Sequence, residues 1–131
     1  MAYLPLILGF LPSFAWLIFY LEEDPHPEPK KLIFEAFLAG AVSTFIVLGV
    51  QTLFNSWAVD KGITAHTFLS FLFLAGIEEF FKFGAVWIVI SKNRDNFDEP
   101  VDAMIYLIVV ALGFAAVENM AAASSACELA F

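Results

Sequence analysis

The chain has 131 residues, of which 61% are hydrophobic and only 15% charged, and its formal net charge is −8. A soluble domain normally has about 45–50% apolar and about 25% charged residues, and the excess here lies in long blocks, which indicates a protein embedded in the lipid bilayer. The length allows one compact unit, and the lack of a basic patch leaves nucleic-acid binding without electrostatic support.

Four apolar blocks each approach or exceed the roughly 20 residues that a helix needs to cross the hydrocarbon core. They cover residues 2–21, 32–57, 65–90 and 100–126. The sequence therefore predicts an all-α fold, an integral membrane bundle of about four transmembrane helices that forms a single domain over residues 1–131. Pro5 and Pro12 interrupt the first block, where a kink is expected.

The connecting segments are polar and contain residues that end helices. Residues 22–31 read EEDPHPEPKK, and residues 91–99 read SKNRDNFDE. Four basic residues lie in these two loops: Lys30, Lys31, Lys92 and Arg94. The opposite side holds only Lys61, so the positive-inside rule predicts that loops 22–31 and 91–99 are cytoplasmic and that both termini lie outside.

Glu78, Glu79 and Lys82 lie in the middle of the third block, within LAGIEEFFKFGAV. Each charge near the bilayer centre costs about 2.5–3.5 kcal/mol on the insertion scale. Lys82 follows Glu78 by four residues and Glu79 by three, so either acid can meet it on one helix face. A self-neutralised cluster that only orders the bundle is one interpretation, and a functional polar site is the favoured one.

Asp98, Asp102 and Tyr106 recur every four residues and predict a polar stripe that runs inward from the cytoplasmic end of the fourth helix. Glu99 or Asp98 is expected to cap this helix, with Pro100 in its first turn. Asp102 is equally well explained as the acid of a capping box that begins at Glu99.

Glu118 and Asn119 lie within GFAAVENMAAASSA, a run of small residues suited to close helix–helix contact, which places Glu118 toward protein. At a rise of 1.5 Å per residue, Glu78 lies about 18 Å and Glu118 about 27 Å from the cytoplasmic loop. If the third and fourth helices pack antiparallel across their short loop, the two glutamate clusters face each other within about two turns. The expected site is a wet pocket between these helices that opens toward the cytoplasm.

Adjacent carboxylates in a low-dielectric pocket do not both ionise easily, and one can act as a general base on water while an acid or Lys82 donates a proton. This pattern suits hydrolysis and, equally, proton-coupled transport. No cofactor is expected. A metal site is not supported because His26 and His66 fall in the first loop and at the outer end of the third helix, away from the glutamates. Glu35, four residues after Lys31, is expected to form a surface pair with it.

At these residues the chain resembles the PrsW family of intramembrane proteases, relatives of the CAAX-prenyl-protease-like membrane enzymes. EEFFK, residues 78–82, matches the E-E-x-x-K motif of the family. FDEPVDAMIY, residues 97–106, resembles F-D-x-P-x-D-G-x-x-Y, with Ala103 in place of the glycine. GFAAVEN, residues 113–119, matches a third motif, and FYLEEDPHPEPKKLIFEAFLAGA resembles the first cytoplasmic loop and second helix.

The resemblance implies a peptide hydrolase of a bacterial-type plasma membrane. Its substrate would be a membrane-embedded or membrane-proximal protein, such as an anti-sigma-factor-like regulator. Glu78 and Glu79 would activate water and protonate the leaving amine, in an order that is left open. The expected catalytic residues are Glu78, Glu79 and Glu118, and the supporting residues are Lys82, Asp98, Asp102, Tyr106 and Asn119.

The family also has a later helix with a histidine in an H-A-L-F-like motif, and the chain ends at Phe131 before such a segment. The bundle is therefore expected to be an incomplete version of a larger one. Two alternatives to an intramembrane protease stay open. One is a proton-linked transporter or channel subunit that uses the same acids, and the other is a truncated, non-catalytic membrane scaffold.

Overall fold

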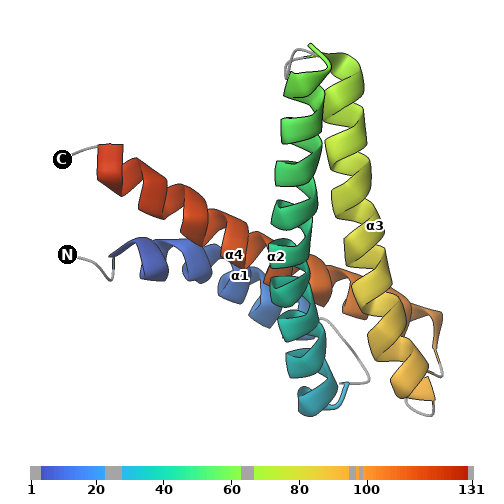
Figure 1. The fold of residues 1–131 in the computed structure, drawn as a ribbon. Helices are drawn as coiled ribbons and strands as arrows, with labels where there is room; N and C mark the ends of the chain where they lie inside the picture. Colours follow the sequence, from blue (N-terminus) through green and yellow to red (C-terminus); the bar gives the residue numbers. More distant parts are fainter. Residues whose placement is uncertain (1–3, 23–27, 63–66, 95–96, 98, 130–131) are drawn as a thin grey trace.

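A computed structural model shows the chain as four helices joined by short connections (Figure 1). It describes residues 4–22, 28–62, 67–94, 97 and 99–129, so His26, His66 and Asp98 lie outside the described residues. The helices are α1 (Leu4–Glu22), α2 (Lys30–Asp60), α3 (Phe68–Lys92) and α4 (Pro100–Leu129). The described residues contain no strand, and the predicted all-α fold with four helices is confirmed. α1 continues as a helix through Pro12.

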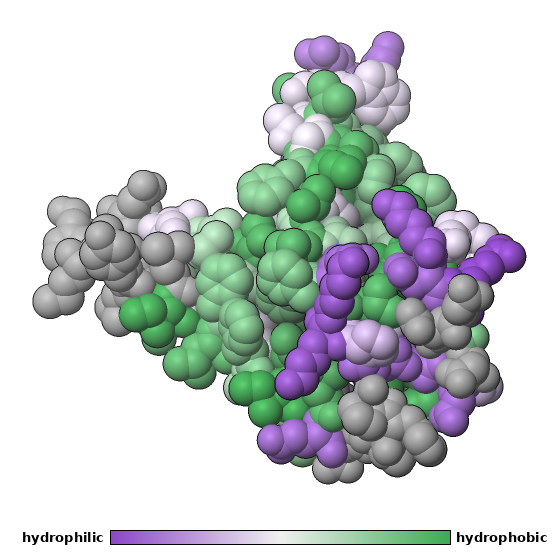
Figure 2. Space-filling model, turned by 90° about the horizontal axis from the view of Figure 1, so that it is seen from below, coloured by the Kyte–Doolittle hydropathy of each residue, from purple (hydrophilic) through white to green (hydrophobic). Residues whose placement is uncertain are grey.

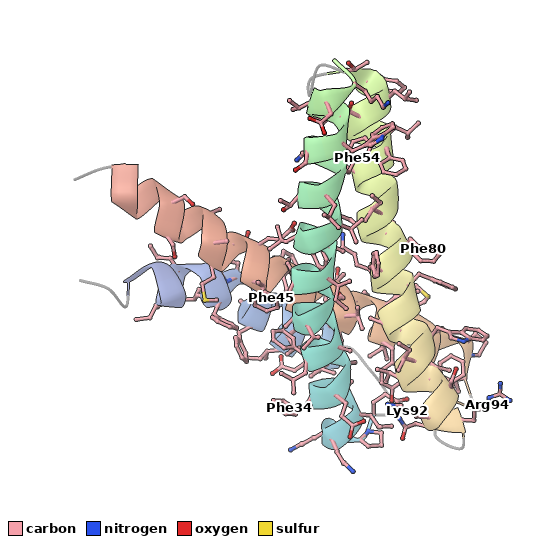
Figure 3. The ribbon with its side chains drawn as sticks, in the orientation of Figure 1. Phe34, Phe45, Phe54, Phe80, Lys92 and Arg94 are labelled. Atoms are coloured by element: carbon pink, nitrogen blue, oxygen red, sulfur yellow. The ribbon has the colours of Figure 1, made fainter. Side chains whose placement is uncertain are left out.

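Two of the four helices are long and apolar enough to cross a membrane. These are α2 and, in α4, the stretch from Pro100 to Ser125; α1 holds a shorter apolar stretch, Ile7–Glu22. α3 carries three charged residues at its centre and is otherwise as apolar as its neighbours. Large hydrophobic side chains point away from the bundle at mid-helix, such as Phe45 of α2 and Phe80 of α3 (Figure 3). A surface of this kind suits lipid and not water.

α2 and α3 form an antiparallel hairpin, and α1 and α4 lie side by side and cross its lower half (Figure 1). α4 packs extensively on α1 and α2 and touches α3 only locally. The expectation that the third and fourth helices pack along each other is therefore wrong for most of their length. The short connection between them brings the beginning of α4 close to the end of α3, and further along the two helices meet around Lys82 and Phe114.

Glycines bring the backbones of α2 and α4 into direct contact. A Cβ atom at Gly113 would lie 2.1 Å from the carbonyl oxygen of Phe37, and one at Gly40 would lie 2.0 Å from that of Val110. The Thr44 hydroxyl lies 3.2 Å from the carbonyl oxygen of Gly40, one turn back on α2, and 3.4 Å from that of Phe114 on α4, so its single hydrogen is shared between the two helices. Close backbone approach of this kind lets apolar helices attract each other without a hydrophobic driving force.

The packed core lies where α4 and α1 meet the lower halves of α2 and α3. Its buried members include Leu32, Phe37, Val86, Val89, Ile105, Val109 and Val110. No other described helix covers the upper half of the hairpin, where the rings of Phe54 and Phe73 stack with centroids 4.5 Å apart. The charged residues of α3 lie between these two halves, at the upper border of the packed core.

Basic residues are distributed unevenly between the two ends of the hairpin. Lys92 and Arg94 lie at its lower end, next to the beginning of α2, whereas Lys61 lies at the upper end (Figures 1 and 3). Seen from below, hydrophilic side chains gather around these lower loop ends, beside the hydrophobic flank that α1 and α4 form (Figure 2). Lys31 forms the predicted surface pair with Glu35, with Nζ and Oε1 3.8 Å apart.

Candidate active site

Lys82 joins the two helices that carry the predicted acids. Its Nζ lies 2.9 Å from Oε1 of Glu79, one turn back on α3, which confirms that the lysine pairs with one of the two glutamates. The same nitrogen lies 4.6 Å from the ring centroid of Phe114, a buried residue of α4. An ammonium group over a ring face gains a cation–π attraction that grows as water is excluded. The lysine therefore connects α3 electrostatically to α4.

Glu78 has a different partner, which lies on α2. Nε2 of Gln51 donates a hydrogen bond to Oε1 of Glu78 at 2.8 Å, in a partly buried position between the two helices. Gln51 could not be predicted from the sequence because one amide in a long apolar block forms no motif and no regular spacing. Its position alone indicated a contact, because a polar side chain within a transmembrane helix normally forms a hydrogen bond with a neighbouring helix.

Glu118 joins the cluster from α4, one turn beyond Phe114. Its carboxyl group lies close enough to Glu78 and Lys82 to interact electrostatically with both. Glu118 and its neighbour Asn119 are exposed, however, and not enclosed by the described helices as the small-residue run predicted. The structure thus brings the three predicted catalytic glutamates to one region, with Glu118 at its edge.

Of the clustered charged residues, Glu79 and Lys82 line a groove on the side of the bundle. The groove has a volume of about 440 Å³, and it is lined by Glu79, Lys82 and Phe83 of α3 and by Leu107, Ile108 and Ala111 of α4. The inner face of α4 between Tyr106 and Glu118 is filled by buried side chains, including Val109, Val110 and Phe114. Apolar packing therefore occupies the inner face of α4 between the two polar regions, and the predicted opening toward the cytoplasm stays a prediction.

Two of the predicted supporting residues belong to a second polar cluster at the beginning of α4. Oδ2 of Asp102 accepts a hydrogen bond from the backbone N–H of Glu99 at 2.9 Å, which is the capping-box contact that the spacing allowed. The Tyr106 hydroxyl donates to Oε2 of Glu28 at 2.6 Å. Tyr106 precedes Phe114 by eight residues, about 12 Å along the helix, so this cluster is separate from the three glutamates.

Tyr106→Phe tests whether this second cluster ties the segment before α2 to α4. Tyr106 is only 2% exposed, so the substitution keeps the packing and removes one hydrogen bond to a carboxylate. We expect the free energy of unfolding to fall by about 1–3 kcal/mol. Chemical unfolding in detergent micelles, followed by circular dichroism, measures the change. Tyr20→Phe, at an exposed position of α1, is the matched control and should have no effect.

A membrane helix bundle with carboxylates and a lysine inside its span is the arrangement of an intramembrane enzyme or of a proton-conducting protein. Comparison with known proteins distinguishes these classes. A family model described as "PrsW family intramembrane metalloprotease" matches residues 28–129, and the chain belongs to this family.

The relatives with this name come from several bacteria. Protease PrsW of Geobacillus kaustophilus (strain HTA426) is 34% identical over 113 residues, which cover 86% of this chain and 48% of that protein. Protease PrsW of Bacillus subtilis (strain 168) is 32% identical over 113 residues, which cover 86% and 50%. The chain thus spans about half the length of the curated relatives it matches. No solved structure matches it significantly.

The family description implies a metal ion, and the described residues do not fit one. No group of three or more histidine, cysteine or acidic side chains in the described ranges has the geometry to hold a metal. Glu79 is engaged by Lys82, which leaves Glu78 and Glu118 as the acidic donors of the cluster. Two carboxylates are an incomplete ligand set for a catalytic site, which typically has three protein ligands.

Proposed function

We propose that the chain forms part of an intramembrane peptide hydrolase that uses glutamate to activate water. The observation that carries this proposal is the convergence of Glu78, Glu79 and Lys82 of α3 with Glu118 of α4 at mid-helix depth. Charged groups at this depth are costly, so a cluster of four supports a chemical role over a structural one. Membership of a protease family supports hydrolysis as that role.

The different partners of the two adjacent glutamates support different roles for them. The charge of Glu79 is compensated by Lys82, at 2.9 Å, whereas the hydrogen bond of Glu78 comes from a neutral amide. Glu78 is therefore the carboxylate available to take a proton from water, and Glu79 holds Lys82 in place. Glu118, across from Glu78, supplies a second carboxylate that orients the same water.

In the proposed hydrolysis, Glu78 and Lys82 account for the proton transfers and for the charge on the carbonyl oxygen. Glu78 removes a proton from water as the hydroxide oxygen bonds to the carbonyl carbon of the scissile peptide. Negative charge develops on the carbonyl oxygen, and the remaining N–H donors of Lys82 stabilise it. The C–N bond breaks, and Glu78 passes its proton to the departing amine. The products are a carboxylic acid and an amine, and Glu78 is again a carboxylate.

The lateral groove suits a substrate that arrives within the bilayer. Apart from Glu79 and Lys82 its lining is apolar, so it accepts a hydrophobic segment. The substrate we propose is a membrane-embedded or membrane-proximal regulatory protein, such as an anti-sigma-factor-like regulator. We place the enzyme in a bacterial plasma membrane with the loops that contain Lys30, Lys31, Lys92 and Arg94 in the cytoplasm.

Glu78→Gln tests the proposed function. The substitution removes the general base and leaves a side chain of the same shape, so cleavage of a model transmembrane peptide should fall about 10²- to 10⁴-fold. The assay uses the chain reconstituted in liposomes, with fragments resolved by mass spectrometry. Glu35→Gln is the matched control, since this glutamate also forms an ion pair on a helix but lies on the exposed surface of α2. Its cleavage rate should equal that of the unaltered chain.

Two outcomes would contradict the proposal. Undiminished cleavage by Glu78→Gln would remove this residue from the chemistry. Proton flux across the liposome membrane without any cleavage would favour the alternative of a proton-linked transporter that uses the same acids.

A further inference from the structure

Gln51 is a polar side chain in the middle of an apolar helix. It follows IVLGV in α2 and precedes TLF, about 14 Å from the hairpin tip at Asp60. Glu78 lies at the same height on α3, ten residues after Phe68, where that helix begins. The stacked rings of Phe54 and Phe73, between this level and the tip, fix the register that brings the amide and the carboxylate together.

We infer that Gln51 is a positioning residue that holds the Glu78 carboxylate in its reactive orientation. The inference rests on the proposed function. The hydrogen bond from Nε2 to Oε1, 2.8 Å long, engages one carboxylate oxygen, and in the proposed mechanism the other oxygen, Oε2, accepts the proton from water. A flexible glutamate side chain has three rotatable bonds, and fixing one oxygen selects a single orientation for the other.

A glutamine suits this position better than a charged partner. Its side chain has both an N–H donor and a carbonyl acceptor. The amide donates to the carboxylate before proton transfer and, after turning over, accepts from the carboxylic acid that proton transfer creates. Gln51 thus keeps a partner for Glu78 in both states of the cycle. A lysine there would bond the carboxylate alone, as Lys82 bonds Glu79.

The chain offers a direct test of the contact because Gln51 is its only glutamine. Labelling with side-chain ¹⁵N-glutamine gives one pair of amide signals in the nuclear magnetic resonance spectrum of the full chain in micelles. Glu78→Met should shift this pair, because it removes the acceptor and keeps the length of the side chain. Glu35→Met, at another glutamate that forms an ion pair on its own helix, is the control and should leave the pair in place. If the chemical shifts of the Gln51 amide pair do not change in Glu78→Met, the inference is wrong.

The second arm measures catalysis in the liposome assay. Gln51→Met should lower kcat roughly 10- to 100-fold with KM within about twofold of the unaltered chain, since misplacement of a reacting group by about 1 Å has effects of this size. Asn55→Leu removes an exposed amide one turn further along α2 and should leave both constants unchanged.

The outcomes separate this inference from the proposed function. If Glu78→Gln abolishes cleavage and Gln51→Met leaves kcat unchanged, Gln51 only holds the helices together, and the inference is wrong while the proposed function stands. If Glu78→Gln cleaves like the unaltered chain, the proposed function itself fails, whatever the spectra show. A fall in kcat for Gln51→Met together with a shifted amide pair in Glu78→Met supports both.

Discussion

Gly113→Ala is expected to lower the free energy of unfolding by about 1–3 kcal/mol or more, although it adds a single methyl group. The new Cβ atom would lie 2.1 Å from the carbonyl oxygen of Phe37 and 3.2 Å from the backbone nitrogen of Ala41. Backbone atoms of a helix cannot rotate away, so α4 has to move from α2 by more than about 1 Å. That movement breaks the Thr44 contact with Phe114 and shifts Phe114 beneath Lys82. Cleavage should therefore fall together with stability.

Gly49→Ala is the matched control because a Cβ atom there meets nothing within 4 Å. It should be neutral or stabilising by up to about 1 kcal/mol, since alanine favours the helix over glycine. Gly40→Ala, which meets the carbonyl oxygen of Val110 at 2.0 Å, should resemble Gly113→Ala. The double substitution should cost less than the sum, because one methyl already separates the helices for the other. Unfolding by sodium dodecyl sulfate measures these differences, and equal stability of Gly113→Ala and Gly49→Ala would disprove the contact.

The number of helices and their approximate positions could be predicted from the sequence because long apolar blocks report directly on the hydrocarbon core. Most of their ends could not, although the predicted beginning of α4 at Pro100 agrees with the structure. α2 runs from Lys30 to Asp60, two to three residues beyond each end of the apolar block. Hydropathy marks where side chains meet lipid, whereas the helix continues through polar residues until a backbone constraint stops it. Here Pro29 precedes the helix, and Gly62, with φ of 69°, follows it.

The partner of α4 could not be predicted from the same pattern. The small residues around Gly113 correctly indicated close helix–helix contact, but the short third loop suggested α3 as the neighbour. The observed neighbours are α2, through Gly40 and Gly113, and α1, where a Cβ atom at Gly9 would lie 2.6 Å from Cα of Met120. A glycine shows that something can approach closely, and only the fold shows what does.

In the candidate site, too, contacts between residues close in the sequence were easier to predict than contacts between distant residues. The pair of Glu79 and Lys82, three residues apart, followed from helix geometry alone. Gln51 lies 27 residues from Glu78, and Glu28 lies 78 residues from Tyr106. Neither contact leaves a periodic trace in the sequence. Pairs on one helix were therefore predictable in detail. Between helices, the approach of Glu118 to Glu78 was predicted, but the partners Gln51 and Glu28 were not.

Lys82→Met is expected to separate the electrostatic role of the lysine from its chemical one. Other protein atoms leave 75% of the Glu79 side chain exposed. In water, an ion pair with this exposure contributes only about 0–1 kcal/mol to stability. If α3 crosses the bilayer, as the sequence predicts, the same exposure means contact with lipid. An uncompensated charge there costs about 2.5–3.5 kcal/mol, so the lipid effect should prevail and the free energy of unfolding in bicelles should fall by an amount of this order.

Three companion variants identify the cause of that loss. Glu79→Gln combined with Lys82→Met removes both charges and should restore most of the stability, because a neutral pair leaves no charge uncompensated. Lys82→Arg should stay close to the unaltered chain in stability, since its guanidinium keeps the charge and stacks on the ring of Phe114. Phe114→Leu should weaken that contact in both backgrounds. A loss below about 1 kcal/mol for Lys82→Met alone would instead place the pair in water.

Cleavage should respond differently from stability in the same variants. Loss of the group that faces the developing oxyanion typically lowers kcat about 10²- to 10³-fold. We expect this fall in Lys82→Met and also in the double variant with Glu79→Gln, although the latter regains its stability. A stable but inactive double variant would show that Lys82 acts on the reaction and not only on the fold. If cleavage returned together with stability, the lysine would serve only to neutralise Glu79, and the oxyanion would need another donor.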